Sequence, residues 1–171
     1  MDFIDLAKAR FSVRDYSDKP IEPEKLSLII EAAKVAPTAA NKQPQKIYVL
    51  KSKEAIEKIR GITRCAFNAP VVFMISYDTE REWKNPLEEG ITSGVEDVSI
   101  VATHMMMEAW DLGIGSCWVN AFANSAAHEA FDLPETEKVI LLMPMGYPSD
   151  KAEPRPQHTT FRELDDFVKE L

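Results

Sequence analysis

Two arginines flank a serine near the start of the chain, at Arg10, Ser12 and Arg14. In an extended segment, residues spaced by two project to the same side, so both guanidiniums and the hydroxyl would face one point. Guanidinium donors form a fork that matches the oxygens of a phosphate monoester. The spacing indicates a small anion site. The alternative is that Arg10 caps its own helix while Arg14 pairs with Asp15 or Asp18.

A second candidate segment, residues 36–44, has the sequence Ala-Pro-Thr-Ala-Ala-Asn-Lys-Gln-Pro. Pro37 ends the preceding helix and exposes small residues whose backbone can approach a flat ligand. Asn41 and Gln43 each offer a donor and an acceptor, which suits the polar edge of a planar ring. A polar loop that only joins two elements is the alternative interpretation.

The third candidate segment, residues 113–119, has the sequence Gly-Ile-Gly-Ser-Cys-Trp-Val. Its glycines and Ser116 leave backbone amides open to close approach, and Trp118 would form the wall of a ring pocket. A helix cap that leads into a strand, with Trp118 in the core, explains the same residues without a ligand.

Composition excludes several classes of protein. The formal net charge is -8 and the pI is about 5.0, so the surface as a whole repels nucleic acids and anionic membranes. Residues 1–60 nevertheless hold 12 Lys and Arg against 9 Asp and Glu. The two cysteines form no CxxC pair, and no apolar run approaches the length of a membrane span. The first residues lack the basic start of a secretory signal, so we expect a cytoplasmic protein.

The usual catalytic and nucleotide motifs are absent. Gly113 and Gly115 follow a predicted helix, and Trp118 stands where a dinucleotide fingerprint would need its third glycine. There is no P-loop, and the three histidines have no HExxH-type partners. We therefore assign no catalytic side chain and no metal ligand, and expect a bound cofactor to carry the chemistry if the protein is an enzyme.

The elements that would position these segments alternate between helices and strands within one domain, residues 1–171. Helices are predicted from an Asp2 cap to about Arg10, from Pro23 to Ala36, from a Ser52 cap to Arg60, over 95–112, and from Asn124 or Ser125 to Phe131. Strands are predicted over 47–50, 71–75, 116–119 and 139–145, and an amphipathic turn or helix near 163–171. Such a chain is expected to adopt an α+β or three-layer α/β fold.

Taken together and in this order, the three segments resemble the nitroreductase family of FMN-dependent oxidoreductases. Residues 10–16 resemble its opening R-x-S-x-R-x-[FY] motif, residues 36–44 its AP-[ST]-x-x-N-x-QP loop, and residues 113–119 its GLGTCW-type loop. Residues 69–72 and 146–148 fall where the family has an AP-strand and a GYP turn. The resemblance extends to about residue 160 and is strongest to the short members.

The resemblance implies a three-layer α/β/α sandwich of the α+β class. A small, mainly antiparallel sheet would be wrapped by helices around a long central helix, and two chains would form an intertwined homodimer with FMN at its interface. The cofactor-binding residues implied are Arg10, Phe11, Ser12, Arg14, Pro37, Thr38, Ala39, Asn41, Gln43, Ser116, Cys117, Trp118 and Arg155.

Within this set, the resemblance assigns Arg10, Ser12 and Arg14 to the phosphate and ribityl end of FMN, with Arg14 extending toward the ring. The partner subunit would supply residues 37–39, Asn41 and Gln43 would line the flavin region, and residues 116–118 would pass close to the isoalloxazine ring. NADH or NADPH would reduce FMN, and a small electron-poor acceptor such as a nitroaromatic or quinone would then take the electrons in a ping-pong cycle.

Several positions depart from the family pattern. Glu153 and Gln157 stand where two bases usually close the phosphate site, which leaves Arg155 as the best candidate and His158 or Lys151 as substitutes. Gln45 replaces an aromatic residue after the second motif.

Other residues and functions remain open. Trp83 and Phe122 either shape the acceptor pocket or only pack. The alternative function is a non-catalytic flavin-handling protein or a redox sensor that uses Cys117. A purely structural dimeric module would leave the arginines without an anion.

Overall fold

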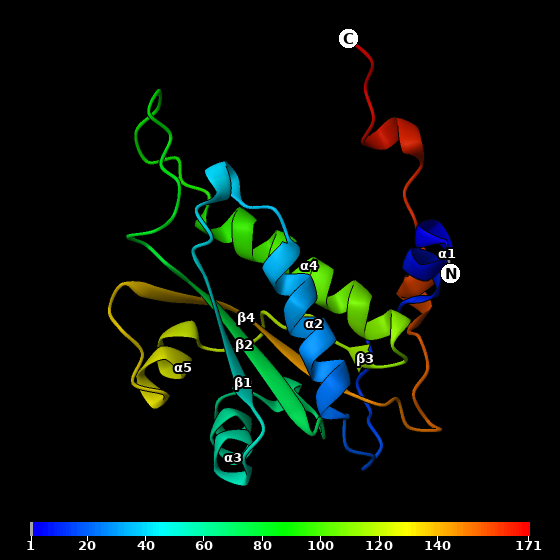
Figure 1. Ribbon diagram of the computed structural model, residues 1–171. Helices are drawn as coiled ribbons and strands as arrows, with labels where there is room; N and C mark the ends of the chain where they lie inside the picture. The colour runs from blue at the N-terminus through cyan, green and yellow to red at the C-terminus, as the bar shows by residue number, and fades with distance from the viewer. Residues whose placement is uncertain (1) are drawn as a thin grey trace.

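The chain folds around a four-stranded antiparallel sheet in the computed structural model, which describes residues 2–171 (Figure 1). In spatial order the strands are β1 (Gln45–Leu50), β2 (Val71–Asp78), β4 (Glu137–Gly146) and β3 (Gly115–Ser116). The helices are α1 (Phe3–Ala9), α2 (Pro23–Val35), α3 (Lys53–Ile62), α4 (Gly94–Asp111) and α5 (Asn124–Ala130). Short 3-10 turns are η1 (Ala39–Asn41), η2 (Arg64–Ala66), η3 (Pro156–Thr159) and η4 (Leu164–Asp166).

Helices cover both faces of the sheet, and β2 lies at the centre of the core. Phe73 and Ile75 pack toward α2 and α4, whereas Val72 and Met74 pack toward α3 and α5, because successive side chains of a strand point to opposite faces. All four side chains are completely buried. The three-layer α+β arrangement predicted from the sequence is confirmed.

The helix boundaries follow local chemistry. Pro23 occupies the first turn of α2, and the Ser52 hydroxyl accepts a hydrogen bond from the Ala55 amide to begin α3. The long helix predicted over 95–112 is α4, which ends where Gly113 adopts a φ of 78°. Because α4 has 18 residues, it is about 27 Å long at 1.5 Å per residue.

The strand predicted over 116–119 is shorter than expected. β3 ends at Ser116, and only a single bridge between Val119 and Leu142 follows. The Cys117 amide donates to the Pro144 carbonyl over 3.2 Å, but a proline has no amide hydrogen to donate back. The ladder is therefore interrupted opposite Pro144.

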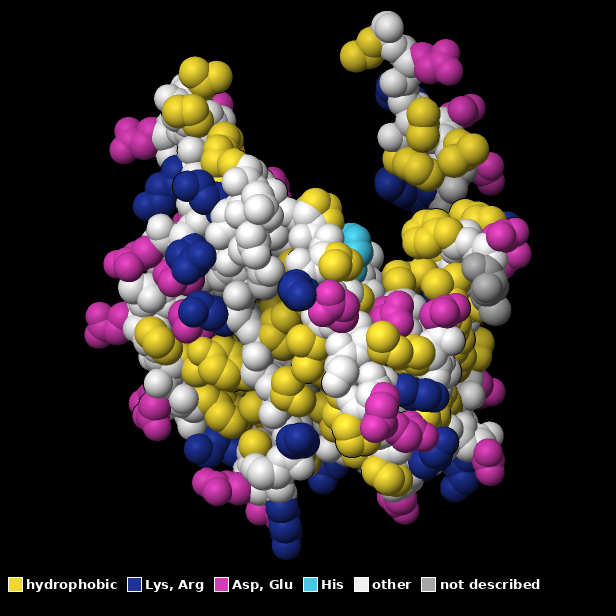
Figure 2. Space-filling view, in the orientation of Figure 1, with side chains coloured by type: hydrophobic (Ala, Val, Ile, Leu, Met, Phe, Trp, Pro, Cys, Tyr) yellow, Lys and Arg dark blue, Asp and Glu magenta, His cyan; other side chains and the backbone are white. Residues whose placement is uncertain are grey.

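Both ends of the chain also refine the sequence predictions. Asp2 takes the N-cap position of α1, but its side chain makes no capping hydrogen bond. Near the C-terminus the amphipathic segment forms only the single turn η4, and its apolar side chains, Leu164, Phe167 and Val168, are exposed. The tail therefore leaves the body without burying its apolar side (Figure 2).

Candidate functional site

Arg10, Ser12 and Arg14 face a common cavity, as their spacing predicts. The cavity has a volume of about 450 Å³. Arg155 from the C-terminal tail reaches the same space, so three guanidiniums converge there. The complete lining is Arg10, Phe11, Ser12, Arg14, Arg155, Gln157 and His158, and we call this space the arginine cavity.

Backbone contacts fix the segment that carries these side chains. Ser12 forms a parallel bridge with Ser116, and the Val13 amide donates to the Ser116 carbonyl over 2.9 Å. A Cβ on Gly115 would lie 2.5 Å from Val13 Cγ2, so only glycine lets the two backbones approach this closely. The Tyr16 hydroxyl donates to the Val13 and Pro144 carbonyls over 2.8 and 3.0 Å and closes the segment against β4.

The cavity is electrostatically unbalanced. In residues 2–171, neither Arg10, Arg14 nor Arg155 forms a salt bridge with a carboxylate. Arg14 Nη1 donates to the Ser12 carbonyl over 2.9 Å, whereas Asp15 accepts a hydrogen bond from Ser149 instead. The proposed alternative pairing of Arg14 with a nearby aspartate is therefore absent from the described chain. Burial lowers the pKa of the Arg10 guanidinium, as expected for a cation removed from water without a paired anion.

The third candidate segment contributes its first residues to this region. Ser116 is buried beside Ser12, and Cys117 is 3% exposed. Burial raises the pKa of the Cys117 thiol, although the nearby charge of Arg14 acts in the opposite direction. The thiol is therefore the favoured form, which argues against a reactive thiolate. Trp118 lies further along, where its indole Nε1 donates to Asn120 Oδ1 over 2.6 Å.

The backbone amides of residues 117–119 differ in whether they donate a hydrogen bond. The Cys117 and Val119 amides donate to carbonyls of β4. The Trp118 amide makes no hydrogen bond within residues 2–171. It is the backbone donor that this segment can offer to a ligand.

The second candidate segment lies elsewhere in the chain. Residues 37–43 surround η1 at the N-terminal end of α4, whereas the arginine cavity lies near its C-terminal end, beside α1 and β3 (Figure 1). Asn41 and Gln43 are exposed. Within one chain, Pro37, Thr38, Ala39, Asn41 and Gln43 are thus separated from Arg10, Ser12 and Arg14 by the length of α4.

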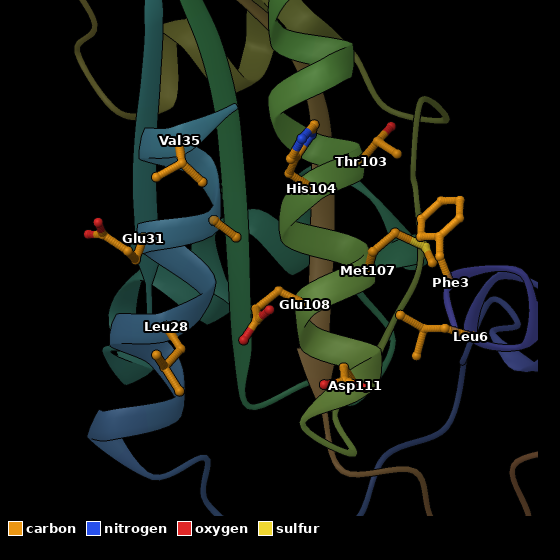
Figure 3. A pocket seen from close by; sticks show the side chains of 11 residues that line it. Phe3, Leu6, Leu28, Glu31, Val35, Thr103, His104, Met107, Glu108 and Asp111 are labelled. Atoms are coloured by element: carbon orange, nitrogen blue, oxygen red, sulfur yellow. The ribbon is translucent and has the colours of Figure 1, made fainter. Parts of the chain in front are cut away.

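An apolar groove follows the outer side of α4. It has a volume of about 720 Å³ and lies between α1, α2 and α4 (Figure 3). Phe3, Leu28 and Val35 contribute exposed apolar side chains to it. Its complete lining is Phe3, Leu6, Leu28, Glu31, Ala32, Val35, Thr103, His104, Met107, Glu108 and Asp111. We call this space the α4 groove.

Two groups of residues were not assigned by sequence reasoning. Gln157 and His158 line the arginine cavity, although the sequence indicated Gln157 only as a departure from an expected base and His158 only as a substitute base; Lys151 does not line it. Asp97 holds the second candidate segment through a hydrogen bond to the Ala39 amide. Neither Trp83 nor Phe122 lines the arginine cavity or the α4 groove.

Other site classes find no support in the described residues. No three His, Cys, Asp or Glu side chains of residues 2–171 come together as metal ligands would. The same part of the chain contains no helix whose length and apolarity would let it cross a membrane.

Comparison with known proteins gives consistent matches. The model of the family described as "Nitroreductase family" matches residues 7–68 and 63–147. A crystal structure of a nitroreductase family protein from Clostridium difficile 630 is 36% identical, with a TM-score of 0.92 over 99% of this chain and 98% of that one. An FMN-dependent nitroreductase from Clostridium difficile R20291 is 26% identical, with a TM-score of 0.72 over 94% of this chain and 98% of that one. An NADPH-dependent oxidoreductase from Staphylococcus haemolyticus is 26% identical over 90% of this chain and 67% of its own length.

Proposed function

Because the chain belongs to the nitroreductase family, we propose that it is an FMN-dependent oxidoreductase that moves electrons from NADH or NADPH to a small electron-poor acceptor. Nitroaromatics and quinones are the acceptor classes that we expect. When bound, FMN would supply the redox chemistry, namely hydride transfer from the nicotinamide and electron transfer to the acceptor in a ping-pong cycle. The chain itself binds, orients and shields the reacting groups.

The observation that carries this proposal is the convergence of three guanidiniums without a carboxylate partner. Arg10, Arg14 and Arg155 surround a cavity that also presents the Ser12 hydroxyl. This set of donors fits the phosphate of FMN, which carries close to two negative charges at neutral pH and accepts several hydrogen bonds. A structural role alone would leave these like charges facing one another across the cavity, which is unfavourable.

The segment after β3 would lie beside the flavin ring. Ser116 adjoins Ser12, so the chain continues from the phosphate end toward Cys117 and Trp118. The Trp118 amide is available as a donor because it makes no hydrogen bond within residues 2–171, whereas the amides on either side bond to β4. A donor held in place by the hydrogen bonds of Cys117 and Val119 to β4 would stabilise negative charge that develops on a reduced ring without reorganising, so no side chain is needed as acid or base.

The complete site requires a second copy of the chain. The exposed outer side of α4 includes Val95, Ile100 and His104, and we propose that it packs against the same helix of another chain in antiparallel orientation. Such a twofold arrangement places the N-terminal end of one α4 beside the C-terminal end of the other. Residues 37–43 of one chain would then complete the arginine cavity of its partner. The FMN would lie at the interface of this homodimer.

The exposed apolar tail supports the same assembly. Phe161, Phe167 and Val168 are more than half exposed, and the tail projects from the body in Figure 2. The α4 groove provides an apolar surface of matching character. Covering both in a dimer would remove exposed apolar area that a monomer would leave in water.

Mixing two defective variants tests the shared site. Arg14→Ala removes part of the phosphate end, and Asn41→Gly removes the amide from the other end without forcing a side chain into a left-handed backbone (φ 52°). In a two-chain site, each mixed dimer contains one intact site, so co-refolding equal amounts should restore about one quarter of all FMN sites. No restored high-affinity site in verified mixed dimers would place the whole site within one chain.

The proposed activity has a direct test. The purified protein should be yellow and should release FMN on denaturation, and anaerobic addition of NADH or NADPH should bleach the flavin rapidly. A protein that binds FMN but is bleached by neither donor is a flavin-handling protein or sensor rather than a reductase. A colourless protein that cannot be reconstituted with FMN would exclude both functions.

A further inference from the structure

A buried carboxylate fixes the far end of the proposed site. Asp97, in the first turn of α4, is 1% exposed. Its Oδ1 accepts a hydrogen bond from the Ala39 amide over 2.7 Å, and its Oδ2 accepts one from the Ser93 hydroxyl over 2.7 Å. A buried carboxylate needs such donors, and the N-terminal end of a helix also favours its negative charge.

The loop that Asp97 contacts has an unfavourable backbone. Ala40, Asn41 and Gln43 have φ values of 48°, 52° and 49°, in the left-handed region where side chains other than glycine are strained. Such a conformation persists only where its surroundings hold it. The same residues include the two amides assigned to the flavin region.

Hydrogen bonds within residues 38–43 do not attach this loop to the body. The Gln43 amide donates to Thr38 Oγ1, and the amides of Asn41 and Lys42 donate to carbonyls of the same loop. In the described chain, the bond from Ala39 to Asp97 is the only hydrogen bond that connects residues 38–43 to another element. Its loss would leave the loop held by its two covalent ends and by packing.

Asp97 also connects this loop to a second one. The Ser93 hydroxyl that donates to Asp97 accepts a hydrogen bond from the Trp83 amide over 3.2 Å. A continuous series of hydrogen bonds therefore joins Trp83, Ser93, Asp97 and Ala39. The Ala39 amide and the Ser93 hydroxyl each donate their single hydrogen to Asp97. The series therefore needs an acceptor at both oxygens of this side chain, which an ionised carboxylate provides.

We propose that Asp97 is a positioning residue, which fixes the left-handed conformation of residues 38–43 and thereby sets the affinity of the shared site for FMN. This inference rests on the FMN-dependent function proposed above. Asp97 touches no part of the arginine cavity. It acts through the loop, at the end of α4 opposite to the guanidiniums.

Four variants of the full-length chain test the role of Asp97. Asp97→Ala removes both acceptors. Asp97→Asn keeps the shape and one carbonyl acceptor for Ala39, and Ser93→Ala breaks only the second bond. Glu137→Gln is the matched control, because Glu137 is also buried and accepts two hydrogen bonds on Oε2, but from donors outside the loop.

Two measurements are needed for each variant. Hydrogen exchange of the Ala39 amide in FMN-free protein reports the loop itself, and titration of FMN fluorescence reports affinity. We expect Asp97→Ala to accelerate Ala39 exchange and to weaken FMN binding about 10- to 100-fold, the range for a lost hydrogen bond to a charged group. Asp97→Asn and Ser93→Ala should have smaller effects of the same kind. Glu137→Gln should change FMN affinity by less than about twofold, even if it melts at a lower temperature.

Two results would overturn the inference. One is unchanged exchange at Ala39 in Asp97→Ala or, if that variant does not fold, in both Asp97→Asn and Ser93→Ala. The other is faster exchange with unchanged FMN affinity. If Arg14→Ala weakens FMN binding and Asp97→Ala does not, the role of Asp97 fails while the proposed function stands. If the wild-type chain does not bind FMN, both fail.

Discussion

Replacing Arg14 with alanine should weaken the binding of FMN far more than the binding of riboflavin, which has the same ring but no phosphate. Arg14 lines the arginine cavity, and its hydrogen bond to the Ser12 carbonyl uses only one of its five donor hydrogens. The remaining donors face a space that also contains Arg10 and Arg155. The variant therefore tests whether the cavity recognises phosphate.

The size of the effect follows from the contact that is lost. A hydrogen bond to a charged group contributes about 1.5–3 kcal/mol, and each 1.4 kcal/mol is about tenfold in affinity, so FMN should bind roughly 10- to 100-fold more weakly. If Arg14 binds the phosphate, riboflavin affinity should change by less than about threefold, because riboflavin lacks that group. Losing the bond to the Ser12 carbonyl costs the FMN-free protein about 1 kcal/mol, which relief of repulsion between like charges partly offsets. Its melting temperature should therefore fall by no more than about 4 °C.

Fluorescence titrations with both ligands, at low and high salt, measure these changes. Arg60→Ala, an exposed arginine on α3, is the matched control and should leave both affinities unchanged. Arg14→Lys should restore part of the FMN affinity, since it keeps the charge but not the fork. Equal losses for FMN and riboflavin would refute the phosphate assignment and indicate that Arg14 contacts the part that both ligands share. A large drop in melting temperature without a change in FMN affinity would make Arg14 structural.

Three further predictions concern the surroundings of the site. Gly115→Ala should lower the free energy of unfolding by about 1–3 kcal/mol in urea, because the added Cβ would lie 2.5 Å from Val13 Cγ2. The hydrogen bond from the Tyr147 hydroxyl lowers the pKa of the Glu22 carboxyl to about 2, so its contribution to stability is complete above the usual pKa of 4.5 and is lost as the pH falls toward 2. In Glu22→Gln, the melting temperature should therefore fall less than in the wild type as the pH is lowered from about 4.5 toward 2, as measured by thermal melting at a series of pH values. The Cys117 thiol, whose pKa burial raises, should react slowly with iodoacetamide at pH 7.5 in the native protein.

Each of these changes has a control in the same chain. Gly61→Ala adds a Cβ with no atom within 4 Å and should not destabilise the protein, so equal losses in the two glycine variants would contradict the close-approach argument. Glu153→Gln removes an exposed carboxylate of the tail, and its pH curve should match that of the wild type. Cys65 is only partly buried and serves as the reference thiol; faster labelling of Cys117 than of Cys65 would revive the redox-sensor interpretation.

Local spacing was enough to predict the arginine cavity but not its full lining. Arg10, Ser12 and Arg14 share one side because an extended segment alternates, and this geometry depends on no distant contact. Arg155 could be assigned only from the order of motifs in the family. It lies more than 140 residues away, on a tail whose course no local periodicity determines. Gln157 is a neutral residue at a position where a base was expected, so its type did not indicate that it lines the cavity.

Asp97 shows the opposite case. In sequence it is one of two adjacent acids in the first turn of a helix, where a carboxylate is favoured without any tertiary contact. Its burial depends on a loop 58 residues away that folds over it. No property of residues 93–97 predicts that contact. The short form of β3 has a similar origin, because it depends on the proline that lies opposite in β4.

In the proposed dimer, the length of α4 would explain how a site divided between two chains is still well defined. One end of this helix is attached to residues 38–43 by Asp97, and the other end leads through Gly115 to the bridge between Ser12 and Ser116. Both ends are thus fixed to one rigid helix that is about 27 Å long. In the proposed antiparallel dimer, this helix length would set the distance between the arginine cavity of one chain and residues 37–43 of its partner. A substitution on the outer side of α4, such as Thr103→Trp, should therefore alter FMN affinity by changing this distance, although Thr103 lies in neither half of the site.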